Sequence, residues 1–110
     1  FPVIVSIVVN IDDWQTETGL KILTTTSNPE IVFEFNDFNY YDKYAEVLLQ
    51  VELNENVAYT LSLTDSYCDG LSISSLLFPA VVYYGETTQE EFEIASVEIA
   101  EFGCGINTTF

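Results

Sequence analysis

The sequence predicts an all-β protein, an antiparallel β-sandwich or jelly-roll-like fold of seven or eight strands and one disulfide. Strand-forming Val, Ile, Thr, Tyr and Phe are abundant, and aromatic residues make up 15% of the chain. Apolar and polar residues alternate with a period of two in several short segments, with turn residues between them and no helical period. A chain of 110 residues that is 48% hydrophobic can bury one core. The sequence therefore predicts a single module over residues 1–110.

Three strands are predicted in the N-terminal third. Residues 3–11 carry a continuous apolar face formed by Val3, Val5, Ile7, Val9 and Ile11. Ile4 and Val8 make the opposite face partly apolar, so this strand is either covered on both sides or lies at a subunit contact. A second strand is expected at 20–23, after a turn at Gly19. A third is expected at 31–35, where the apolar positions are Ile31, Phe33 and Phe35.

The middle of the chain carries the most regular alternation. Residues 36–45 are polar and rich in aromatics, which predicts a connection between strands. Val47, Leu49, Val51 and Leu53 alternate with Leu48, Gln50 and Glu52, and residues 59–64 alternate between apolar and polar side chains. Because a short turn at 54–56 separates them, these two segments are predicted to pair as a hairpin.

The C-terminal third contains two more predicted strands. Residues 80–84 are apolar and aromatic and follow Pro79. In the last strand Phe92 and Ile94 are expected to point inward, before the apolar phase changes to Val97 and Ile99. Such a change of phase indicates a β-bulge. The acidic side chains of this strand are expected to face water, namely Glu91, Glu93 and Glu98.

The charge of the chain excludes several classes of partner. Eighteen Asp and Glu against two Lys give a net charge of −16. Such a surface repels nucleic-acid phosphates and anionic lipid. The apolar run 3–9 is far shorter than the roughly 20 residues that span a bilayer, so membrane insertion is not expected. What remains is a soluble secreted protein, a binder of divalent cations, or a surface covered by partners or glycans.

Catalysis is not expected. The chain has no His and no Arg, which excludes Ser-His-Asp and Cys-His chemistry. A pair of carboxylates can hydrolyse glycosides, but with eighteen acidic residues a pair at a suitable separation is expected by chance. We therefore predict that the protein is not an enzyme.

An acidic loop is the candidate metal site. Asp65 and Asp69 precede Gly70, so one loop offers two carboxylates and a residue that tolerates a tight turn. Calcium is bound by six to eight such oxygen ligands. A second loop would add ligands if the two meet at one end of the sandwich, and its candidates are Asp12, Asp13 and Glu17. The alternative is that Asp65 and Asp69 hydrogen-bond the loop backbone as Asx turns.

Aromatic and asparagine residues suggest two kinds of contact with sugars. Trp14, Tyr40 and Tyr41 are candidates for a sugar-stacking platform, the alternative being ordinary packing in the core and at sheet edges. Asn107 begins the sequon Asn-Thr-Thr and is a candidate for N-linked glycosylation.

The two cysteines, Cys68 and Cys104, are compatible with one disulfide. Closing the loop between them would stabilise the fold by about 4 kcal/mol on the chain-entropy estimate. Two buried, unpaired thiols are the alternative.

Two segments carry a resemblance to a known module. Residues 12–18 read Asp-Asp-Trp-Gln-Thr-Glu-Thr, and residues 65–70 read Asp-Ser-Tyr-Cys-Asp-Gly. They resemble the opening turn and the Asp-Ser-Tyr-Gly-Asp-Gly loop of β-sandwich repeat modules in secreted proteins of marine bacteria and protists. Cys68 departs from that pattern, which has Gly at this position and its cysteines elsewhere. We infer that a Cys68–Cys104 bridge replaces the usual bridges.

The resemblance implies a noncatalytic module of an extracellular protein. The first hypothesis is a structural module that self-assembles, or packs with sister modules, in a cell-surface assembly or filament. The alternative is a carbohydrate-binding module of a larger secreted protein, with Ca²⁺ as the one cofactor considered.

Overall fold

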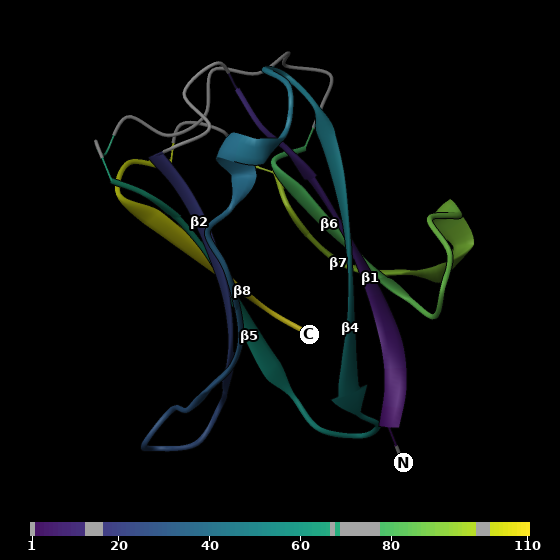
Figure 1. Cartoon of the computed structure of the whole chain (residues 1–110). Coiled ribbons are helices and arrows are strands. Elements are labelled where there is room, and N and C mark those ends of the chain that lie inside the picture. The colour runs from purple at the N-terminus through teal and green to yellow at the C-terminus, as the bar shows by residue number, and fades with distance from the viewer. Residues whose placement is uncertain (1, 13–16, 67, 69–77, 99–101) are drawn as a thin grey trace.

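Eight strands form two four-stranded antiparallel sheets that face each other, as Figure 1 shows. The structure is a computed structural model that describes residues 2–12, 17–66, 68, 78–98 and 102–110. In sheet A the order is β4 (Glu46–Asn54), β1 (Pro2–Asn10), β6 (Ala80–Tyr84) and β7 (Glu93–Val97). In sheet B the order is β3 (Ile31–Phe35), β2 (Thr18–Thr24), β5 (Tyr59–Asp65) and β8 (Gly105–Thr109). The predicted all-β sandwich with one disulfide is confirmed.

The core lies between the two sheets because each strand turns one apolar face inward. In β4 every second residue is buried, from Val47 to Leu53, and the residues between them are exposed. β5 alternates in the same way from Tyr59 to Asp65. Burying one Val, Leu or Ile side chain stabilises the fold by about 1.5–3 kcal/mol, so these two rows are a large part of the driving force.

A short 3₁₀ turn, η2 (Phe38–Tyr40), lies in the connection between β3 and β4. Figure 1 shows it between the upper ends of the two sheets. Phe38 is fully buried, and its ring packs edge-on against Phe35 with 4.8 Å between the ring centres. The connection therefore supplies a core residue, which its polar composition did not predict.

The outer face of β1 is covered within the same chain. Ser6 and Asn10 point away from the core, yet both are buried, as is Val8 between them. The Ser6 hydroxyl donates to the Gly85 carbonyl at 2.7 Å, and the side-chain amide of Asn10 donates to the Phe78 carbonyl at 2.8 Å. Segments on either side of β6 thus bond the two polar residues of this face, and Val8 is buried within the chain, whereas Ile4 stays partly exposed.

The predicted hairpin between residues 47–53 and 59–64 is wrong. β4 pairs with β1 in sheet A, whereas β5 pairs with β2 and β8 in sheet B. The chain crosses from one sheet to the other at residues 55–58. The alternation showed only that each strand has one buried face. Two strands in opposite sheets that face a common core have the same alternation as two strands paired in a hairpin.

Two apolar residues of the last predicted strand are more exposed than expected. Phe92 and Ile94 are exposed, and Phe92 belongs to a second 3₁₀ turn, η3 (Glu90–Phe92). Val82 pairs with Ala95 and the next residue, Tyr83, pairs with Glu93, so Ile94 is the extra residue of a bulge. The predicted bulge exists: Ala95 packs against the core, and Ile94, although exposed, lines a cavity together with the core-facing Val3, Val5 and Leu53. Ile99 lies outside the described residues.

A second register shift explains an exposed residue of β3. Ile22 pairs with Phe33 and the next residue, Leu23, pairs with Ile31, so Val32 is an extra residue in β3. Phe33 and Phe35 pack against the core, whereas Ile31 is exposed. The predicted common face of Ile31, Phe33 and Phe35 therefore holds for the two phenylalanines only.

Candidate functional site

The two loops of the candidate calcium site lie at the same end of the sandwich. Thr18 at the start of β2 pairs with Asp65 at the end of β5, and the Ser66 amide donates to the Glu17 carbonyl at 2.9 Å. Asp65 is buried, and Glu17 is partly exposed. The structure thus brings Asp65 and Glu17 together. Asp13 and Asp69, which complete the predicted set with Asp12, lie outside the described residues.

A shallow hollow of about 290 Å³ lies beside these two acids. Its lining adds Asn36 and the buried Thr18, whose hydroxyl has no hydrogen-bond partner among the described residues. Asp12 does not line it, and the Asp12 carbonyl instead accepts from the Tyr44 amide at 3.3 Å. Within the described ranges no three Asp, Glu or Cys residues lie close enough to hold a metal ion. Calcium binding therefore stays a prediction.

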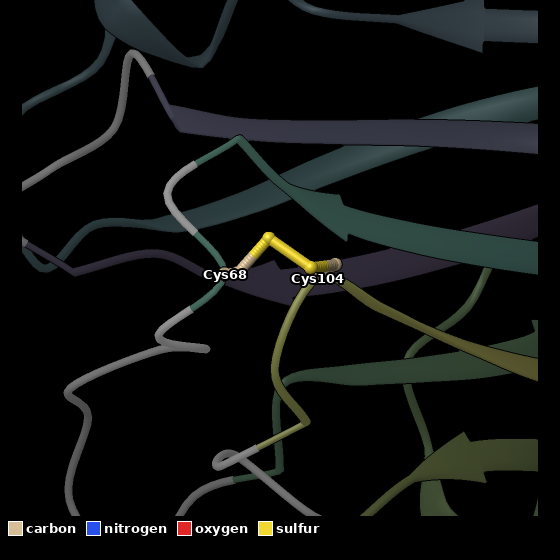
Figure 2. The surroundings of a disulfide bond; sticks show 2 residues. All are labelled: Cys68 and Cys104. Carbon is tan, nitrogen blue, oxygen red and sulfur yellow. A yellow bond between two sulfur atoms is a disulfide. The ribbon is translucent and has the colours of Figure 1, made fainter.

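The cysteines form the predicted disulfide. Cys68 and Cys104 are bonded, and Figure 2 shows the bridge between the loop that follows β5 and the residue that precedes β8. The Asp65 amide donates to the Cys104 carbonyl at 2.9 Å, so backbone pairing already brings the two segments together. The bridge fixes the end of the sandwich where the acidic loops lie.

The aromatic candidates divide into exposed and packed rings. Tyr40 is 81% exposed, and Tyr44 is also well exposed in the same connection. Tyr41 is less exposed and its ring lies 6.3 Å from that of Phe35, so it contributes partly to packing. Trp14 lies outside the described residues. The structure therefore supports Tyr40 as an available ring more than Tyr41.

Asn107 lies in the middle of β8, an edge strand of sheet B. Its side chain is exposed on the outer face, because the preceding residue, Ile106, packs against the core. The candidate glycosylation site is therefore accessible in the folded protein.

The outer face of sheet A holds a tyrosine, Tyr83, among several carboxylates. Burial raises the pKa of the Tyr83 phenol above its ordinary value, and the carboxylates of Glu93, Glu46 and Glu90 raise it further. Leu48 of β4 lies on the same outer face and is half exposed. The strict alternation of β4 could have placed Leu48 outward from the sequence. Tyr83 follows the buried Val82 and pairs with Ser6 without a register shift, whereas its pairing with Glu93 depends on the bulge in β7.

Comparison of the chain with protein-family models, with curated proteins and with solved structures gives no match. No helix among the described residues is long and apolar enough to cross a membrane. The disulfide is typical of proteins that fold in an oxidising compartment.

Proposed function

We propose that the protein is a noncatalytic, extracellular structural module that assembles with copies of itself, or with sister modules, in a cell-surface assembly or filament. The observation that carries this proposal is the edge strand β4. It is nine residues long and pairs without a register shift with β1. In the part of the chain that the structure describes, no strand pairs with its other side.

Backbone hydrogen bonds identify the groups at this edge. On the β6 side of β1, the backbone amide of Asn10 donates to the Pro79 carbonyl, and the Ile4 carbonyl accepts from the Gly85 amide. On the β4 side, the backbone amide of Ile11, directly after β1, donates to the Ala45 carbonyl. Successive residues of a strand point their backbone groups to opposite sides. The odd residues of β4 therefore face β1, and the even residues point their N–H and C=O groups outward.

Four of the outward residues offer a template for another strand, and they are Glu46, Leu48, Gln50 and Glu52. The fifth, Asn54, is already occupied, because its amide donates to the Tyr59 hydroxyl at 3.0 Å. β4 contains no proline, lysine or bulge, which are the usual devices that prevent an edge from pairing. This edge therefore supports pairing with a second chain.

Charge restricts how two copies would pair. In an antiparallel pair centred on Leu48, this side chain meets its own copy and Glu46 meets Gln50. A shift that sets Glu46 opposite Glu52 is disfavoured, because like charges across a ladder repel. Two chains with a net charge of −16 also repel at long range, and salt screens that repulsion. Assembly should therefore strengthen with ionic strength.

The test is the particle size of the disulfide-bonded protein by sedimentation velocity, at low and at raised salt. We expect the wild type to form larger particles at raised salt. Leu48→Lys, which places a charge at the centre of the free edge, should form smaller particles than the wild type under the same conditions. Thr60→Lys is the matched control, because it adds the same charge to the outer face of sheet B and should still assemble. A wild type that stays monomeric at every salt concentration would contradict the proposal.

A second candidate function is carbohydrate binding, with or without calcium at Glu17 and Asp65, and the exposure of Tyr40 favours it. A ring this accessible can stack on a sugar face. Binding to a glycan array, with and without Ca²⁺, should then be saturable and lost in Tyr40→Ala. Phe92→Ala, which removes an exposed ring elsewhere, should bind as the wild type does. An array without hits would dismiss this alternative.

A further inference from the structure

We propose that Asn107 carries an N-linked glycan that lies over the outer face of sheet B and protects the β8 edge from pairing. The proposal concerns the sheet opposite the assembling edge, so it stands or fails separately from the proposed function.

The geometry of the sequon supports this modification. Asn107 and Thr109 are both exposed and lie two residues apart in β8, so their side chains share the outer face. In the ladder with β5, Asn107 pairs with Ser62 and Thr109 pairs with Thr60. The acceptor amide and the sequon hydroxyl are thus adjacent and open to solvent.

The surface around Asn107 has room for sugar. A broad groove of about 450 Å³ passes beside it. Its lining combines hydroxyl groups with the apolar side chains of Leu23 and Pro29, together with Thr24, Thr25, Thr26, Thr60 and Thr109. Hydroxyls can bond sugar oxygens and the apolar side chains can contact sugar C–H groups. The first sugars of a glycan can therefore lie along the sheet.

The position in β8 gives the glycan a physical effect. Tyr59 and Phe110 exchange backbone hydrogen bonds, and the Asp65 amide bonds the Cys104 carbonyl, so the even residues of this segment face β5. Asn107 and its neighbours at 105 and 109 therefore point their backbone groups outward. A bulky, hydrated group in the middle of this row would block another strand, as charged side chains, proline or a covering loop do at other open edges. It would leave β4 as the longest unprotected edge among the described strands.

The transfer itself requires a lipid diphosphate-linked oligosaccharide as donor. The Asn107 Nδ2 atom bonds to the anomeric carbon of the first sugar, and the bond from that carbon to the phosphate oxygen breaks. The electron pair leaves with the lipid diphosphate, and Nδ2 loses one proton. No oxidant or reductant is consumed. The disulfide independently indicates an oxidising compartment, and the secretory compartment that forms such bonds also attaches N-linked glycans.

The test is the intact mass of the full chain, secreted from eukaryotic cells, before and after treatment with a peptide N-glycosidase. We expect the enzyme to remove a glycan and leave aspartate at position 107. Thr109→Ala should lack the glycan, whereas Thr109→Ser should keep it, and both retain Asn107. Secreted, disulfide-bonded wild type with no mass change would overturn the proposal. So would a glycan that persists in Asn107→Gln.

The protective effect has its own measurement. Sedimentation of the Leu48→Lys variant, whose β4 edge is blocked, should show monomers while the glycan is present. After enzymatic removal of the glycan, the same variant should form larger particles through β8. If deglycosylated Leu48→Lys stays monomeric at raised salt, the glycan does not protect this edge.

Discussion

Phe38 illustrates what single residues contribute that sequence patterns do not reveal. It lies within the segment 36–45, where polar residues and tyrosines surround it without any period, so composition indicated a connection. The structure buries it completely against Phe35 in a 3₁₀ turn. Periodicity predicts burial only inside regular strands or helices. A single side chain that is buried in the core from a connection between strands leaves no such signal.

Replacing Phe38 tests this role. Phe38→Ala should lower the free energy of unfolding by about 3–5 kcal/mol, because it removes a buried aromatic ring and leaves a cavity. Tyr40→Ala, two residues away and exposed, should change it by less than about 0.5 kcal/mol. Urea denaturation of both variants measures the difference. Equal effects of the two substitutions would show that Phe38 does not belong to the core.

Tyr83 should make stability depend on pH in the alkaline range. Its folded-state pKa lies above the ordinary value of 10.0, because of burial and then of Glu93, Glu46 and Glu90. Above the unfolded pKa the unfolded chain releases this proton while the folded chain retains it, so stability falls as pH rises toward the folded pKa. Below that range the group has no effect.

Tyr83→Phe should therefore unfold with a flatter pH dependence. The free energy of unfolding of wild type and variant, measured from about pH 8 to about pH 11, should differ by a constant amount up to about pH 10. Above it the wild type should lose stability relative to the variant. Parallel curves over the whole range would show that Tyr83 titrates alike in both states.

At the scale of elements, the sequence predicted most strands but missed β8 and some of the strand partners. β1, β2, β3, β4, β5 and β6 fall at the predicted segments, because alternation depends only on which face is buried. The partner of a strand depends on where the chain goes after the turn. The segment after β4 could return within one sheet or cross to the other, and both choices bury the same side chains. The register shift at Val32 was hidden for the same reason, whereas the change of apolar phase in the last strand did predict the bulge at Ile94.

The crossing between β4 and β5 is stabilised by a contact that can be tested. The Tyr59 hydroxyl accepts the Asn54 amide, and Tyr59 itself is buried. Tyr59→Phe should cost about 0.5–1.5 kcal/mol of unfolding free energy, since the amide loses its acceptor. Tyr84→Phe is the control, because that hydroxyl makes one long, exposed contact with Glu55 and its loss should have almost no effect. Urea denaturation compares the two. Equal losses would contradict a specific role for the Tyr59 hydroxyl.

At the scale of the whole molecule, two sheets around one core were predictable and the candidate site was only partly so. The sequence identified Asp65 and Glu17 as neighbours on the condition that two loops meet, and backbone pairing fulfils that condition. It could not exclude Asp12 from the same hollow, because the path of a loop does not follow from composition. The free edge of β4 was also not visible, since an edge is a property of the assembled sheet.

The disulfide acts on the whole molecule, because it links segments 36 residues apart in the sequence. Replacing both cysteines by alanine should lower the free energy of unfolding by about 4 kcal/mol, through the greater conformational freedom of the unfolded chain. Reduction of the wild type should produce a similar loss, since it removes the same cross-link. Urea denaturation of the oxidised, reduced and double-variant proteins measures it. The backbone bond between Asp65 and Cys104 should survive in the variant, so its circular dichroism spectrum should remain that of a β-protein. A double variant as stable as the oxidised wild type would show that the disulfide contributes nothing to the free energy of unfolding.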